Sequence, residues 1–140
     1  MIAVIRITGD VKLSLKIKET LNRIRLRRKY ALILLKPTDS NLKLLKHIRN
    51  FVAYGTINEK TLKELIESRS QLIDKESKLD VSKIISNIDK SPLEKLGIKP
   101  FFRLHPPRGG IDSKKHFGVT PKAVLGDNKE KINDLIKRML

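Results

Sequence analysis

The sequence predicts a small α+β fold in which two helices pack on one face of a three-stranded sheet, in the order βαβαβ. Three observations support this prediction. Two strand–helix pairs fit within the first 55 residues, a further apolar strand follows at residues 101–104, and the residues between them have helical periodicity. With 140 residues, 39% of them hydrophobic, the chain is long enough for one domain with a buried core.

The first strand–helix pair begins at the N-terminus. Residues 2–8 are rich in β-branched side chains, as strands are, and Gly9 ends the run. A helix is expected over about residues 12–25, because apolar residues recur there on one face. Lysines and arginines flank that apolar stripe and cluster again at residues 27–29. These cations could simply be solvated, and those at the end of the helix are stabilised by the negative end of its dipole. The alternative is that they contact an anion.

The second pair begins with a continuous apolar run at residues 30–36, which is typical of a central strand with a neighbour on each edge. Pro37 ends the run, and the three residues after it offer a helix N-cap. The helix that follows is expected to bury one apolar face, formed by Leu44, Leu45, Ile48, Phe51 and Val52. Gly55 is expected to cap its C-terminus.

The rest of the chain adds helices to this core. Residues 56–98 form a predicted helical insertion with eight Lys/Arg and eight Asp/Glu, so we expect it to face solvent or protein and not phosphate. Residues 106–140 contain a basic loop and an amphipathic C-terminal helix, preceded by a possible capping box at Asp127 and Glu130. Residues 1–55 and 99–105 would form the α+β core of a single domain, 1–140. The order of its strands is left open by the sequence.

Charge gives the clearest indication of a partner. The net charge is +16, and nine Lys/Arg against two Asp/Glu lie in residues 1–30, with six against one in residues 99–122. Such a field favours a polyanion, either a nucleic acid or an anionic membrane surface. The chain has no cysteine, no signal-peptide pattern at its start and no apolar run of transmembrane length, so we expect a soluble intracellular protein.

Signals for catalysis, metals and cofactors are poor. The histidines, His47, His105 and His116, lack metal-ligand spacing, although a pair formed by the last two could in principle bind a metal. Gly109-Gly110 has no accompanying lysine and hydroxyl of a phosphate-binding loop. We therefore predict no enzyme, no metal and no cofactor. The low aromatic content, 4%, argues against serial stacking of single-stranded bases, with Phe101 as the one aromatic of interest.

Several motifs resemble one known family. The most specific is Phe102-Arg103-Leu104-His105-Pro106-Pro107-Arg108-Gly109-Gly110, a short strand that runs into a stiff and then flexible basic loop. The other matching segments are residues 3–7, 20–21 with 26–28, 115–117, and 130–136 with 139–140. Together they resemble the archaeal large-subunit ribosomal protein L-thirty family, whose eukaryotic relative is L-seven.

The resemblance implies a structural constituent of the large ribosomal subunit, located in the cytoplasm within the ribosome. It implies an antiparallel sheet similar to part of a ferredoxin-like fold, with no membrane association and no catalysis. The partners it implies are large-subunit rRNA and neighbouring ribosomal proteins, and it leaves open whether 5S rRNA is close by. The RNA-binding residues it implies lie on the first helix and its exit and on the loop after the third strand. They are Lys12, Lys16, Arg23, Arg27, Arg28, Lys29, Arg103, His105, Arg108, Lys114, Lys115 and His116.

Two other functions remain open at this point. The same distribution of positive charge along the chain is compatible with a free-standing nucleic-acid-binding or chaperone module that acts outside the ribosome. A small enzyme on a ferredoxin-like scaffold, such as a phosphate-ester hydrolase, would need a pocket with convergent polar groups, which the sequence does not indicate.

Overall fold

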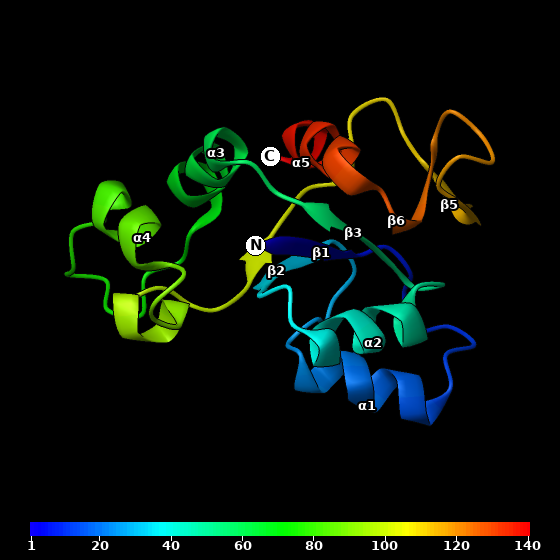
Figure 1. Ribbon diagram of the computed structural model, residues 1–140, viewed down its shortest axis with the longest axis horizontal. Coiled ribbons are helices and arrows are strands. Elements are labelled where there is room, and N and C mark those ends of the chain that lie inside the picture. Colours follow the sequence, from blue (N-terminus) through cyan, green and yellow to red (C-terminus); the bar gives the residue numbers. More distant parts are fainter.

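A computed structural model describes all 140 residues and shows one six-stranded sheet with helices on both faces (Figure 1). The strands are β1 (Ile2–Arg6), β2 (Ala31–Leu35), β3 (Val52–Thr56), β4 (Phe102–Arg103), β5 (Asp112–His116) and β6 (Ala123–Asp127). The helices are α1 (Leu15–Arg23), α2 (Asp39–Ile48), α3 (Glu59–Arg69), α4 (Val81–Asn87) and α5 (Ile132–Met139), with 3-10 turns η1 (Leu93–Leu96) and η2 (Lys129–Lys131).

The strands lie in the order β4-β2-β1-β3-β6-β5. β1 pairs antiparallel with β2 and β3, β2 pairs antiparallel with β4, and β6 runs parallel to both β3 and β5. The α+β class is therefore confirmed, whereas the prediction of three strands is wrong. The predicted strand at residues 101–104 is present as β4, at one edge of the sheet, and β5 forms the opposite edge.

Each face of the sheet has its own hydrophobic core. Ile2 and Val4 of β1 point to the side of α1 and α2, while Ala3 and Ile5 point to the side of α3, α4 and α5. This alternation follows from the two-residue period of a strand. Figure 1 shows α1 and α2 together on one side of the sheet, and α3 and α5 on the other. β1 and β2 are therefore covered on both faces, which explains their unbroken apolar sequences.

Two helix boundaries differ from the sequence prediction. α1 begins at Leu15 with Ser14 as its N-cap, so Lys12 lies in the preceding turn. α2 ends at Ile48, and of the two residues expected to complete its apolar face, Phe51 lies in the turn and Val52 begins β3. Gly55 is thus an interior strand residue and not a helix cap.

The C-terminal part also contains more sheet than expected. Residues 106–140 were predicted to contain a basic loop and a C-terminal helix, but Asp112–His116 form β5 and Ala123–Asp127 form β6. The capping box is wrong as well, because the Asp127 carboxylate accepts from the Lys129 amide and α5 starts only at Ile132. The predicted helices of the 56–98 segment are present as α3, α4 and η1.

Candidate nucleic-acid interface

The exit of α1 and the edge strand β4 enclose a basic hollow of about 360 Å³. Ala31 of β2 pairs with Arg103 of β4, which brings the loop before β2 beside the loop before β4. Five of the eight residues that line this hollow are cationic. We call it the cationic hollow, and its lining consists of Arg25, Arg27, Arg28, Lys29, Ala31, Phe101, Arg103 and Leu104.

A buried arginine on β1 holds the cationic loop in place. The Arg6 side chain, only 1% exposed, donates hydrogen bonds to the carbonyl oxygens of Leu26 (3.0 Å) and Arg27 (2.8 Å). Its own carbonyl oxygen accepts from the Tyr30 amide at 2.7 Å. Both ends of the three-residue segment Arg27–Arg28–Lys29 are therefore tied to one residue of the central strand.

Arg6 also fixes the turn that leads into α1. It donates to the Thr8 carbonyl oxygen (2.9 Å) and to the Asp10 carboxylate (2.7 Å). This hydrogen bond and the arginine charge hold the pKa of Asp10 below its usual value of 3.8. The carboxylate of Asp10 thus stays ionised and keeps the buried guanidinium neutralised.

The backbone of the α1 exit has two residues in the left-handed region, Arg25 (φ 67°) and Tyr30 (φ 63°). The Leu26 amide closes the helix by donating to the Leu21 carbonyl oxygen at 2.9 Å. Arg25 then reaches the helical insertion, where it forms an ion pair with Glu94 of η1. Both partners are about half exposed, so the pair adds little stability but places the insertion beside the cationic hollow.

The other wall of the cationic hollow comes from β4. Phe102 is fully buried, whereas Arg103 is exposed and Phe101 is half-buried. The Arg103 guanidinium lies over the Phe101 ring, 5.6 Å from its centroid. Leu104 donates its amide to the Tyr30 carbonyl oxygen (3.1 Å), which joins the two walls.

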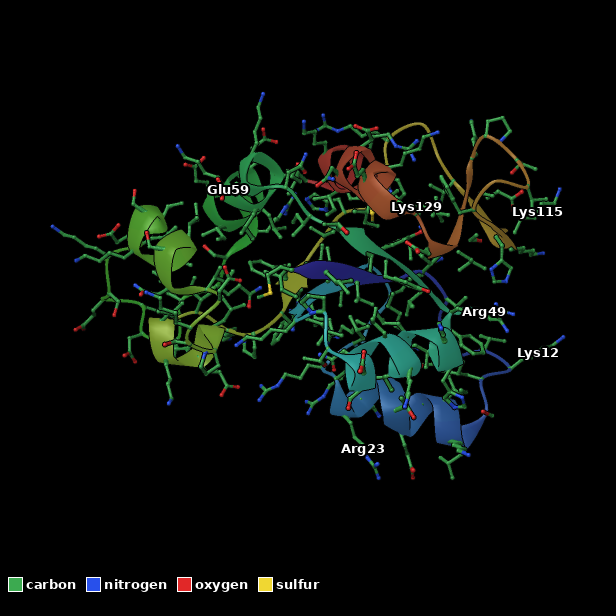
Figure 2. All side chains as sticks on the ribbon, viewed as in Figure 1. Lys12, Arg23, Arg49, Glu59, Lys115 and Lys129 are labelled. Atoms are coloured by element: carbon green, nitrogen blue, oxygen red, sulfur yellow. The ribbon has the colours of Figure 1, made fainter.

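All twelve predicted RNA-binding side chains are exposed, but they do not form the two patches expected from the sequence. Arg27, Arg28 and Lys29 lie together with Arg103 around the cationic hollow. Figure 2 shows Lys12 and Arg23 at opposite ends of α1, so the predicted flank of that helix is an extended row and not a cluster.

The predicted second patch is divided across the molecule. His105 and Arg108 donate their amides to the Met139 and Arg138 carbonyl oxygens at the C-terminus of α5. Lys114, Lys115 and His116 belong to β5, at the edge of the sheet opposite to β4. We call these three residues the β5 cations; Lys115 lies apart from Arg23 in Figure 2. His105 and His116 are on different elements, and no group of three potential metal ligands occurs in the structure.

Comparisons with known proteins give full-length matches in archaea. The chain is 34% identical to large ribosomal subunit protein uL30 of Archaeoglobus fulgidus, covering 99% of both chains. It is 35% identical to the protein of that name from Nanoarchaeum equitans and 36% to that from Aeropyrum pernix, covering 99% of this chain and 97% and 98% of theirs. The chain belongs to the uL30 family. No family model matches it.

Membership in uL30 confirms the resemblance to the archaeal L-thirty proteins that the sequence motifs indicated. Proteins of the uL30 family are structural constituents of the ribosome, so this chain is not an enzyme. None of its helices combines the length and the apolar character needed to cross a bilayer.

Two residues that build the interface of this uL30 member were not predicted from the sequence. Arg25, which follows the end of α1, lines the cationic hollow but was not among the predicted RNA-binding residues. Arg6 was read as an ordinary strand residue. The available signal was an arginine between two isoleucines, Ile5 and Ile7, in an otherwise apolar strand.

Proposed function

We propose that this protein is a structural component of the large ribosomal subunit in the cytoplasm and binds rRNA mainly through the cationic hollow. The observation that carries the proposal is the convergence of five Arg/Lys residues from two separate segments on one hollow. Glu94 is the single carboxylate paired with them, so most of their charge is free to meet phosphate. The names of the uL30 relatives and the net charge of +16 support the same role.

The geometry suits phosphate because the cations are held before RNA arrives. Arg6 fixes the backbone of the loop that carries Arg27 and Arg28, so binding orders fewer degrees of freedom. Arginine presents a planar fork of donors that matches two phosphate oxygens. We expect these contacts to position the protein on folded RNA, with specificity from RNA shape and not from base edges.

The remaining predicted residues extend this interface. Lys12, Lys16 and Arg23 would follow RNA along α1, and the β5 cations would meet a second segment at the far edge of the sheet. His105 and Arg108 would contact RNA beside the end of α5. The neutral segment 56–98 is proposed to face neighbouring ribosomal proteins, and proximity to 5S rRNA remains an expectation of the family resemblance.

Charge reversal tests the proposal. The variant Arg27→Glu/Arg28→Glu/Arg103→Glu should fail to enter large subunits, measured by sedimentation of cell extract through a gradient at low and high salt. The control Lys60→Glu/Lys63→Glu/Lys75→Glu makes the same change in net charge on the exposed surface of the 56–98 segment and should enter subunits. Equal incorporation of the two variants would refute the proposed site.

A free nucleic-acid-binding module is the second candidate, and the distribution of charge along the chain is the one observation that favours it. It predicts a pool of protein at the top of the gradient, or release from subunits by modest salt. For the ribosomal protein as for a free module, six to ten phosphate contacts predict that affinity for isolated duplex RNA fragments falls on the order of a thousand- to a hundred-thousand-fold between about 50 and 200 mM salt. Retention on subunits after a high-salt wash would therefore separate the two candidates.

A further inference from the structure

We propose that the cationic hollow receives one unpaired nucleotide extruded from the RNA, with its base against the Phe101–Arg103 pair and its flanking phosphates on Arg25, Arg27, Arg28 and Lys29. This inference rests on the proposed function, since it names the ligand of that same site. It goes further because a site for phosphates alone needs no aromatic side chain.

The lining of the hollow is what separates a nucleotide from bare phosphate. Ala31, Phe101 and Leu104 give it an apolar part next to the cations. Its volume of about 360 Å³ lies within the range of small-molecule sites, which combine apolar walls with a few placed polar groups. The face of a nucleobase is apolar, and the phosphates on either side of it along the RNA are charged. One nucleotide with its flanking phosphates therefore matches both parts of this lining.

Phe101 is held in position for stacking. One part of its side chain packs against the core under α1 and α2, and the rest lines the hollow, so the ring is half-buried. The Arg103 guanidinium above the ring provides a second planar group, 5.6 Å from the ring centroid. Unpaired bases of RNA are commonly bound by stacking on aromatic rings and on arginine planes.

The stack has room for a single base. Phe101 is the only aromatic residue among those that line the hollow. Tyr30, which is close in sequence to the cationic loop, packs instead against the core on the other face of the sheet. A run of stacked bases would need further aromatic surfaces in series, so the ligand is one extruded nucleotide in an otherwise paired region.

The experiment measures binding of the full chain to three hairpin RNAs that share the same paired stem and loop and differ only in what is inserted at one position of the stem. The first has a fully paired stem, the second has one unpaired adenosine, and the third has an abasic residue at that position. Stacking predicts about tenfold tighter binding of the adenosine bulge than of the other two. Equal binding of the abasic and adenosine bulges would overturn the inference, since the two RNAs share their phosphates.

Two matched variants assign the effect to Phe101. Phe101→Leu keeps an apolar side chain against the core, so it should fold, bind the paired hairpin as before and lose the preference for the bulge. Phe117→Leu is the control, because Phe117 also has a cation over its ring (Lys131, 5.7 Å) but lies outside the hollow. A preference retained in Phe101→Leu would overturn the inference.

The outcomes also distinguish this inference from the proposed function. Steeply salt-dependent binding of all three hairpins with equal affinity would leave rRNA binding intact and remove the nucleotide site. Failure to bind any hairpin, together with failure to enter large subunits, would remove both.

Discussion

At the scale of single residues, the proposed RNA interface depends on Arg6, although this side chain does not contact RNA. Arg6 is buried on the central strand, and its donors satisfy carbonyl oxygens of Thr8, Leu26 and Arg27. The side chain that neutralises it, Asp10, is itself exposed. A buried charge persists only when it is paired and hydrogen-bonded, so this arrangement explains why arginine is tolerated in the core.

Arg6→Met should therefore be costly although methionine keeps an unbranched apolar stem at this buried position. The variant leaves the Leu26 and Arg27 carbonyl oxygens without their donor and Asp10 without its partner, and we expect a loss of about 3 kcal/mol in the free energy of unfolding. Urea denaturation measures it. Arg23→Met, at an exposed position of α1, is the control and should change stability by less than about 0.5 kcal/mol.

The same pair predicts a pH dependence. A carboxyl whose pKa is lower in the folded than in the unfolded chain stabilises the fold above its unfolded pKa and loses this contribution as the pH falls through its folded pKa. Asp10 is such a group, because Arg6 lowers its pKa. The wild-type protein should thus melt at a higher temperature than Asp10→Asn at neutral pH, and the difference should narrow below about pH 4. A difference that is constant over this range would contradict the assignment.

At the scale of elements, the C-terminal helix and β3 are fitted closely to each other. Gly55 lies in β3 under η2 and the start of α5, where an added Cβ would be 2.2 Å from the Lys129 carbonyl oxygen and 2.9 Å from Ile132. The buried Asn133 side chain links the same elements, since it accepts from the Asn58 amide (3.0 Å) and donates to the Thr56 carbonyl oxygen (3.1 Å). A glycine is therefore needed here for close approach and not for a helix cap.

Gly55→Ala should displace η2 and α5 from the sheet. The clash is with backbone and with a β-branched core residue, neither of which can rotate away, so we expect a loss of about 2–4 kcal/mol. Hydrogen exchange should show reduced protection of the α5 amides. Gly9→Ala is the matched control, because nothing lies within 4 Å of its added Cβ, and it should leave both stability and exchange nearly unchanged.

The sequence identified elements where a local pattern decides the structure. The continuous apolar run of β2 and the amphipathic stripe of α5 are clear local patterns, and both elements are present. β3 was missed because its first residue continues the apolar face of α2 and Gly55 imitates a helix cap. β5 was missed because it is an edge strand with exposed charges and no buried alternation.

The candidate site was predictable only in part, because the sequence shows local clusters of cations but not which strands pair with each other. The cluster of cations after α1 is visible in the sequence, but the pairing of Ala31 with Arg103 that closes the hollow is a long-range contact. The division of the second patch has the same origin, since Arg103 and Lys114 are close in the chain yet lie at opposite edges of the sheet. Strand order alone decides which of these cations share a surface.

At the scale of the whole molecule, two groups of cations are separated by the width of a six-stranded sheet. The cationic hollow adjoins β4 at one edge, and the β5 cations lie at the other. The segment 56–98 is neutral overall and adds no net charge to either group. If both edges bind RNA, they must contact different segments of it, and the sheet acts as a rigid spacer between the two contacts.

This separation predicts additive effects on binding. Arg27→Glu/Arg28→Glu and Lys114→Glu/Lys115→Glu should each weaken binding to a large-subunit rRNA fragment and lower the salt dependence of its affinity, because each removes phosphate contacts. Sites more than about 10 Å apart with no shared partner contribute independently, so the quadruple variant should lose the sum of the two free energies within about 0.5 kcal/mol. Fluorescence anisotropy over a salt series measures all four proteins. If the β5 substitutions have no effect in either background, RNA is bound at one edge alone, and the β5 cations are a solvated edge strand that resists pairing with other chains.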